Sequence, residues 1–226
     1  METSIGTYME RTLHAELKRL LEPDETRHEV RYKGYIADIL NEDGIIEVQT
    51  RSFERLRGKL SCFLADVRVT LVFPAVRQKW LVWVDPETGE TTKKRRSPKA
   101  GTVCSALPEL YKIKPLLCHD NLRVQIIPVD VVDYRSLTGW SADKKRGSTR
   151  MERIPVSFGD AVILDHAGDY RKLIPASLAE PFTAAAFGSQ AKLNSRNTWY
   201  ALSLLTDMGV LARCGKRANA YLYERR

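Results

Sequence analysis

The sequence is poor in cysteine, and its four cysteines are far apart in the chain. Cys62, Cys104, Cys118 and Cys214 form no CxxC pair, and no histidine follows them at zinc-finger spacing. This scarcity predicts reduced thiols and argues against structural zinc.

Long apolar runs are missing as well. No segment approaches the run of about 20 apolar residues that a membrane helix needs. Residues 1–6 lack the basic and then apolar order of a secretory signal. We therefore expect no membrane association and a cytoplasmic location. The 226 residues show no internal repeat and fit one large domain, or a medium domain with a small companion.

Positive charge is in excess. The chain has 36 lysines and arginines against 28 acidic residues, which gives a net charge of +8. Such a surplus favours a polyanionic partner, although many basic proteins bind none. The basic run at residues 93–96 is either a solvated loop or a clamp on nucleic acid.

The most informative stretch is residues 35–50. Two short runs rich in Ile, Val and Tyr flank Asn41-Glu42-Asp43-Gly44, whose residues are preferred in tight hairpin loops. The pattern predicts an antiparallel pair of strands, with Asp38 on the first and Glu47 on the second. Carboxylates among apolar neighbours are costly unless a cation or hydrogen bonds compensate them. Two such acids brought close together invite a divalent metal such as Mg²⁺.

These residues resemble the signature of a nuclease superfamily. An Asp on one strand, a short turn, Glu-x-Lys on the next strand and then a helix define the PD-(D/E)XK nucleases. Asp38 and Glu47-Val48-Gln49 look like a variant of that motif. Gln49 stands where the lysine is usual. The variant with Gln is similar to the CoiA-like competence nucleases, which also have an upstream helix with a His and a Lys four residues apart, as His14 and Lys18 are here.

The resemblance implies a metal-dependent reaction. Mg²⁺ (or Mn²⁺) would be held by Asp38, Glu47 and the carbonyl group of Val48, with Glu10 of the first helix as a further ligand. The ion would activate a water molecule to hydrolyse a phosphodiester bond.

Without the motif lysine, another residue must supply the positive charge near the attacking water and the phosphate. Gln49 cannot provide it, but its amide group can hold the attacking water. Lys18 or His14 would supply the charge or the proton transfer. From the residues alone, Glu10, His14 and Lys18 are equally well explained as the solvated edge of a helix over residues 7–21.

Residues 51–64 predict a second helix, with an apolar face and a basic face. Its cations Arg51, Arg55, Arg57 and Lys59 follow the supposed catalytic strand directly. We expect Arg51 and Arg55 to contact backbone phosphates, although a charged outer face is usual for any surface helix. Two separate strands are expected next, at residues 67–73 and 80–85.

The last sixty residues have a pattern of their own. A short helix that Gly188 should end, a turn, a longer helix at residues 196–208 with Trp199 facing inward, and a basic hairpin follow one another. The order resembles a winged helix-turn-helix, which implies contact with DNA, expected to be double-stranded. The residues expected to touch it are Ser195, Arg196, Asn197 and Tyr200 on the second helix and Lys216 and Arg217 on the wing. Winged helices also serve as protein-interaction or dimerisation modules.

The whole sequence therefore predicts an α/β protein. Residues 1–150 should form a restriction-endonuclease-like mixed sheet flanked by helices, and residues 151–226 a small winged-helix domain. The favoured function is a metal-dependent DNA endonuclease. A DNA-binding regulator on an inactive nuclease fold, which Gln49 favours, and a protein-interaction scaffold are the alternatives. The sequence leaves a homodimer open.

Overall fold

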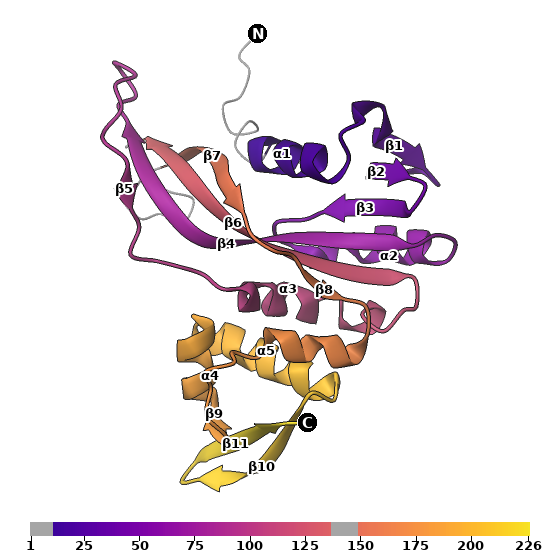
Figure 1. Ribbon diagram of the computed structural model, residues 1–226, viewed down its shortest axis with the longest axis vertical. Helices are drawn as coiled ribbons and strands as arrows, with labels where there is room; N and C mark the ends of the chain where they lie inside the picture. Colours follow the sequence, from indigo (N-terminus) through magenta and orange to yellow (C-terminus); the bar gives the residue numbers. More distant parts are fainter. Residues whose placement is uncertain (1–10, 137–148) are drawn as a thin grey trace.

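The computed structural model describes residues 11–136 and 149–226 (Figure 1). A large mixed sheet with helices on both faces makes this an α/β protein. Within the described residues, no helix has the length and apolarity to cross a membrane. All four cysteines lie in the described part, and each carries a free thiol, as predicted.

The large sheet has the strand order β1-β2-β3-β4-β6-β7. β1 to β3 are antiparallel, β3, β4 and β6 run parallel, and β7 and β8 pair antiparallel with β6, while β5 pairs with β4. The bounds are β1 (His28–Tyr32), β2 (Tyr35–Asn41), β3 (Gly44–Val48), β4 (Val69–Val84), β5 (Arg95–Arg96), β6 (Leu122–Ser136), β7 (Thr149–Phe158) and β8 (Val162–Leu164).

Short helices cover both faces of this sheet. One face carries α1 (Arg11–Leu21), and the other carries α2 (Arg57–Leu64) and α3 (Leu107–Tyr111). Short 3-10 helices connect the elements: η2 (Glu25–Arg27), η3 (Phe53–Leu56), η4 (Val103–Ala106), η5 (Lys114–Leu116) and η6 (Ala167–Leu173).

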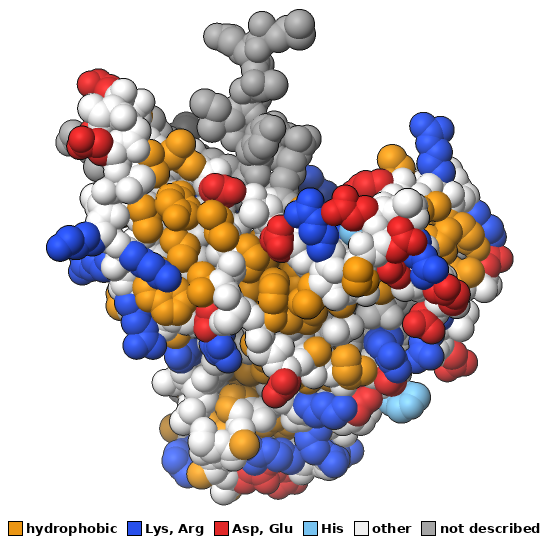
Figure 2. Space-filling model, turned by 45° about the horizontal axis from the view of Figure 1, so that its top comes forward, with side chains coloured by type: hydrophobic (Ala, Val, Ile, Leu, Met, Phe, Trp, Pro, Cys, Tyr) orange, Lys and Arg blue, Asp and Glu red, His pale blue; other side chains and the backbone are white. Residues whose placement is uncertain are grey.

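The prediction of two strands at residues 67–73 and 80–85 was wrong, because β4 is one strand of 16 residues. It pairs with β6 along its length, with a register shift between Val76 and Gln78. The pairing of β3 with β4 stops at Val72, so Pro74 lies where no strand on that side needs its N–H group. Figure 2 shows apolar side chains gathered over this extension of the sheet, at the left of the view.

Two apolar cores hold the layers together. The smaller one packs Leu13 and Leu17 of α1 against Val48, Val72 and neighbouring residues of β6. The larger core lies on the other face, under α2 and α3, and continues without a break into the C-terminal residues. Burial of these side chains, at about 25 cal/mol per Å² of apolar surface, is the main favourable term in folding.

The C-terminal unit consists of two helices joined by a short turn and a small sheet. It contains α4 (Ala184–Ala191), α5 (Ser195–Asp207) and a three-stranded sheet in the order β10-β11-β9, with β9 (Phe182–Thr183), β10 (Leu211–Arg217) and β11 (Ala220–Arg225). The boundary expected at residue 150 falls inside β7, because β7 and β8 hydrogen-bond to β6 of the large sheet. The structure moves that boundary to the end of β8, near residue 165.

Gly188 was expected to end α4, but the helix continues to Ala191, and Lys192 caps it with φ of 57°. A Cβ atom at Gly188 would lie 2.5 Å from Oγ1 of Thr198 on α5. The glycine therefore allows the two helices to approach closely.

Candidate functional site

The hairpin of β2 and β3 brings the two predicted acids opposite each other. Ile39 faces Ile46 in the register, which places Asp38 across from Glu47 at the next position. At this position side-chain oxygens replace the backbone acceptors of the strand pairing. The Val48 N–H donates to Oδ2 of Asp38 (2.8 Å), and the Asp38 N–H donates to Oε1 of Glu47 (3.2 Å). Each carboxylate thus binds the backbone of the opposite strand, and both lie at one place in the sheet.

Two helices supply cations to these acids. Nε2 of His14 on α1 lies 3.1 Å from Oδ2 of Asp38. Nζ of Lys59 on α2 donates to Oε2 of Glu47 at 2.5 Å. The helices lie on opposite faces of the sheet, so the acid pair is held from both sides. Oδ1 of Asp38 accepts no hydrogen bond within the described residues.

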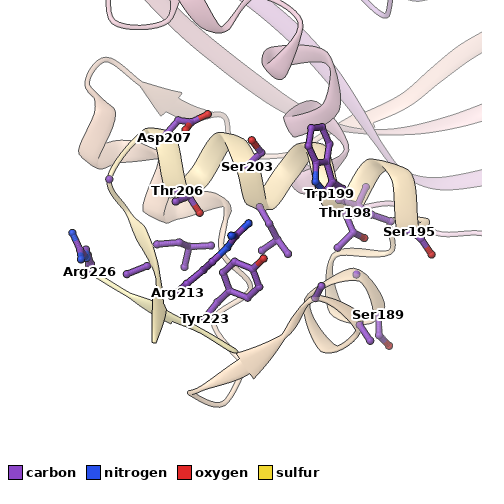
Figure 3. A pocket seen from close by; sticks show the side chains of 18 residues that line it. Ser189, Ser195, Thr198, Trp199, Ser203, Thr206, Asp207, Arg213, Tyr223 and Arg226 are labelled. Atoms are coloured by element: carbon purple, nitrogen blue, oxygen red, sulfur yellow. The ribbon is translucent and has the colours of Figure 1, made fainter. Parts of the chain in front are cut away.

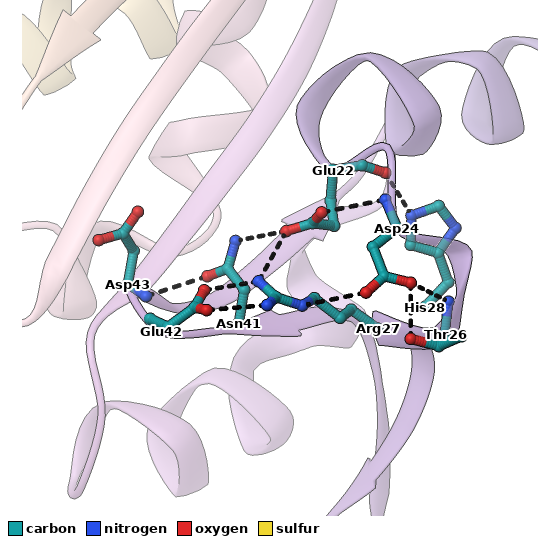
Figure 4. A network of polar contacts seen from close by, with 8 residues as sticks. All are labelled: Glu22, Asp24, Thr26, Arg27, His28, Asn41, Glu42 and Asp43. Carbon is teal, nitrogen blue, oxygen red and sulfur yellow. Dashed lines mark hydrogen bonds and ion pairs between the residues drawn. The ribbon is translucent and has the colours of Figure 1, made fainter.

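A polar network anchors the end of α1, and therefore His14, over this hairpin (Figure 4). Glu22, just after α1, accepts hydrogen bonds from Nδ2 of Asn41 (3.1 Å) and from Nη1 of Arg27 (3.4 Å). Arg27 also forms a bidentate pair with Glu42 in the β2–β3 turn. The link between helix and turn fixes the approach of α1 to Asp38.

The acid pair is electrostatically uneven. Burial, and then the charge of Asp38, raises the pKa of Glu47 to about 7 despite Lys59. Burial alone would raise the pKa of Asp38, but the hydrogen bond and charge of His14 bring it below its ordinary value. Burial would likewise lower the pKa of His14, which its hydrogen bond to Asp38 raises instead. Burial and mutual repulsion therefore act on both acids, and the pKa of Glu47 is the one that rises.

A cavity of about 270 Å³ opens next to the two residues that contact Asp38, although neither Asp38 nor Glu47 lines it. Both Asp38 contacts, His14 and Val48, form part of its wall. The structure thus brings several predicted residues together, because the complete lining is His14, Val48, Gln49, Thr50, Arg51, Ser52 and Arg55.

Three other predicted residues are placed differently. Lys18 pairs with Glu29 on β1 and makes no hydrogen bond or ion pair with Asp38 or Glu47 in the described structure. Nε2 of Gln49 donates to the Arg51 carbonyl group at 2.5 Å, so its amide donor is engaged within the loop. Glu10 lies outside the described residues. The cation at the acid pair is Lys59, which the sequence had suggested only as a phosphate contact.

The donor set suits a hard cation in chemistry. Carboxylate oxygens are the ligands that Mg²⁺ prefers, and two carboxylates lie on neighbouring strands here. Within residues 11–136 and 149–226, no group of three His, Cys, Asp or Glu side chains is placed to hold one ion. A metal here would therefore use Asp38 and Glu47, completed by backbone oxygens, water or substrate.

The second helix of the C-terminal unit turns a different face outward than expected. Trp199 is 57% exposed rather than inward. Tyr200 stacks 4.8 Å from Tyr111 of α3, and Arg196 donates to the Tyr200 hydroxyl at 3.2 Å. Asn197 is half-buried. Of the four residues expected to read DNA, only Ser195 lies in an open groove.

That groove lies between α5, the start of α4 and the β10–β11 hairpin, and has a volume of about 950 Å³. Figure 3 shows Trp199 and Ser203 at one rim, while Arg213 and Tyr223 reach from the hairpin toward α5. The predicted wing cation Lys216 lies 4.7 Å from the ring of Tyr221, and Arg217 is exposed near the hairpin turn.

Comparison with known proteins places the chain in a family. Residues 11–165 match the family described as a domain of unknown function, DUF8091. The chain belongs to the DUF8091 family. The DUF8091 match ends just after β8, so it covers the large sheet and excludes the C-terminal unit.

The whole chain also has a relative. An uncharacterized protein of Treponema pallidum (strain Nichols) is 28% identical over 225 residues, which cover 98% of this chain and 88% of that protein. This similarity spans both the DUF8091 part and the C-terminal unit. No solved structure matches the chain.

Proposed function

We propose that the protein is a metal-dependent deoxyribonuclease that hydrolyses phosphodiester bonds. The observation that carries this proposal is the buried acid pair of Asp38 and Glu47, whose contacts His14 and Val48 line a cavity together with Arg51 and Arg55. Strongly perturbed pKa values, such as the raised pKa of Glu47, cluster at functional sites.

The local architecture supports the resemblance to PD-(D/E)XK nucleases. The acids sit on adjacent strands of a hairpin, and α2 follows the second strand. Lys59 of α2 provides at Glu47 the positive charge that Gln49 cannot provide. A mixed sheet flanked by helices is the fold class that the resemblance implies.

Each residue then has a role. Asp38 and Glu47 would hold Mg²⁺ or Mn²⁺, which when bound lowers the pKa of a water molecule and neutralises charge on the phosphate. Lys59 and His14 hold the two acids in position, and protonated His14 can return a proton. Arg51 and Arg55 bind the backbone phosphates that flank the scissile bond.

The C-terminal unit would bring the enzyme to its substrate. The order of short helix, turn, longer helix and hairpin resembles a winged helix-turn-helix. Its hairpin carries the cations Arg213, Lys216 and Arg217, which suits a polyanion. DNA binding by this unit is part of the proposal.

A second candidate is a DNA-binding regulator that does not cut. It is favoured by the way the protein satisfies its own site: Lys59 binds Glu47, His14 binds Asp38, and Gln49 donates to the Arg51 carbonyl group. In this reading the acid pair is a structural feature of the hairpin.

Cleavage assays separate the two candidates. Supercoiled and linear DNA are incubated with Mg²⁺, with Mn²⁺ and with chelator, using wild type, Asp38→Asn and Glu47→Gln. We expect cutting that needs metal and falls by at least about 100-fold in both variants. The exposed acid variant Glu87→Gln is the charge-matched control and should cut normally. DNA binding without cutting by any form would establish the regulator instead.

A further inference from the structure

The helix α5 does not stand clear of its surroundings. On one flank, Tyr111 of α3 lies 4.8 Å from Tyr200, and Lys114 forms an ion pair of 2.8 Å with Asp207. On the other flank, the hairpin forms the far wall of the groove (Figure 3). A helix that reads duplex DNA must enter a major groove about 12 Å wide. A recessed helix of this kind suits a thinner ligand.

An aromatic side chain marks the rim of this groove. Trp199 is the most exposed of the large hydrophobic residues in the described structure. The rings of Tyr111 and Tyr200 hold it at centroid distances of 5.7 and 5.3 Å. A large apolar ring is therefore exposed at the groove rim and packed edge-on by two other rings.

The hairpin adds cations to a second exposed ring. The guanidinium group of Arg213 lies 4.4 Å from the ring of Tyr221, and Nζ of Lys216 lies 4.7 Å from it. Arg213 also contributes to the groove wall. Tyr221 and Lys216 lie outside the groove lining, and Arg213, which contacts Tyr221, links them to the groove. Exposed rings and positive charge thus extend from the groove onto the hairpin, in a chain whose net charge is +8.

We propose that the groove between α5 and the β10–β11 hairpin binds a single strand of nucleic acid, with bases stacked on Trp199 and Tyr221. Phosphates of the same strand contact Arg213 and Lys216. Stacking on aromatic rings beside cations is how single strands are held without sequence preference, because every base has a flat face. The inference rests on the proposed nucleic-acid partner and specifies that the strand in this groove is unpaired.

Binding measured in chelator tests this separately from cleavage. Fluorescence anisotropy follows labelled oligothymidylate and oligouridylate of about 15 nucleotides, and a duplex of equal length. We expect Trp199→Ala to weaken binding of the single strands by about 5- to 150-fold and to change duplex binding far less. Trp199→Phe keeps an aromatic ring and should stay close to wild type.

Two further variants keep the test decisive if Trp199→Ala unfolds. Tyr221→Ala should weaken single-strand binding in the same direction. Arg213→Gln should lower the slope of log affinity against log salt by about 0.7, while the exposed control Arg171→Gln leaves it unchanged.

The proposal is overturned if wild type binds no single strand. It is also overturned if wild type binds the duplex more tightly than the single strand and Trp199→Ala and Tyr221→Ala weaken both to the same extent. Unchanged single-strand affinity in folded Trp199→Ala or Tyr221→Ala also overturns it. Loss of cutting in Asp38→Asn with single-strand binding intact would support both proposals, whereas single-strand binding without any cutting would retain only this one.

Discussion

The large sheet neutralises buried carboxylates in two different ways. On β6, Asp130 receives both nitrogens of the Arg77 fork at 3.0 and 2.7 Å, together with the Gln78 N–H and the Ser157 hydroxyl. On β2 and β3, each of two neighbouring acids has a single basic side-chain partner within the described residues, His14 for Asp38 and Lys59 for Glu47.

Asp133, the next acid facing a neighbour on β6, repeats the first arrangement. Arg153 of β7 donates to its two oxygens at 2.7 and 3.0 Å. Such bidentate pairs match the shape of a carboxylate and satisfy both of its oxygens. The charges of Asp133 and Asp130 are therefore neutralised by arginine side chains of the protein itself.

The consequences for the pKa values are opposite. Hydrogen bonding to Arg77 holds the pKa of Asp130 below its ordinary value, so that acid stays ionised. Burial and the charge of Asp38 raise that of Glu47 to about 7. The two acids thus differ in environment: Asp130, at the edge of burial, is held ionised by Arg77, whereas the more deeply buried Glu47 is held closer to its neutral form.

The largest effect should come from breaking a bidentate pair. Arg153→Ala leaves Asp133 charged and buried, with only Lys79 at 3.8 Å. We expect a loss of about 4 kcal/mol in the free energy of unfolding, measured by urea denaturation at pH 7. The control Arg171→Ala, at an exposed site, should stay within about 0.5 kcal/mol of wild type. An equal loss of stability in the two variants would show that the Arg153–Asp133 pair does not stabilise the fold.

Stability in chelator should depend on pH through Glu47. Its folded pKa of about 7 exceeds the reference value of 4.5, so the folded state binds the proton more tightly. The stabilisation is complete below pH 4.5 and is lost as the pH rises to 7, by about 3 kcal/mol at most. Urea denaturation at pH 5 and pH 8 should show this loss in wild type and not in Glu47→Gln.

Asp130 should contribute with the opposite sign. Its pKa is lowered in the folded state, so its stabilisation is present at neutral pH and is lost as the pH falls. Asp130→Asn should therefore reduce the loss of unfolding free energy that occurs as the pH falls below 3.8. A rise in wild-type stability from pH 5 to pH 8 that Glu47→Gln does not alter would contradict the assignment of Glu47.

A divalent cation should replace the proton at the acid pair. At pH 8, Mg²⁺ at one hundred times its dissociation constant should stabilise wild type by about 2.7 kcal/mol, because it binds only the folded state. Thermal unfolding with and without Mg²⁺ measures this. Glu47→Gln should lose the response and Asp130→Asn should keep it. Equal stabilisation of both variants would mean that the ion binds elsewhere.

The sequence was sufficient to predict the hairpin and its acids because both depend on local patterns. The turn residues at positions 41–44 and the alternation on either side determine the pairing of Asp38 with Glu47. Lys59 at Glu47 could not be predicted in the same way. Its contact depends on how α2 packs under the sheet, and that packing follows from the tertiary structure.

The errors have the same origin in distant contacts. The exposed face of α5 was misjudged because α3, nearly a hundred residues earlier, covers Tyr200 and leaves Trp199 outside. The single strand β4 was divided in two because Pro74 and the polar pair Arg77-Gln78 interrupt its apolar pattern. Pairing with β6 overrides that local signal.

The smallest expected loss of stability comes from removing one of several hydrogen bonds to a single carboxylate. Ser157→Ala removes one of four hydrogen bonds to Asp130, and the Arg77 fork and the Gln78 N–H remain. We expect a loss of about 1 kcal/mol or less by urea denaturation, the net value of one hydrogen bond at a partly solvated site. Lys59→Met, by contrast, removes the cation that contacts Glu47 directly, and its cost should grow from pH 5 to pH 8 as that acid ionises. If the stability loss in Ser157→Ala depends more steeply on pH than the loss in Lys59→Met, Asp130 and not Glu47 is the acid that ionises between pH 5 and pH 8.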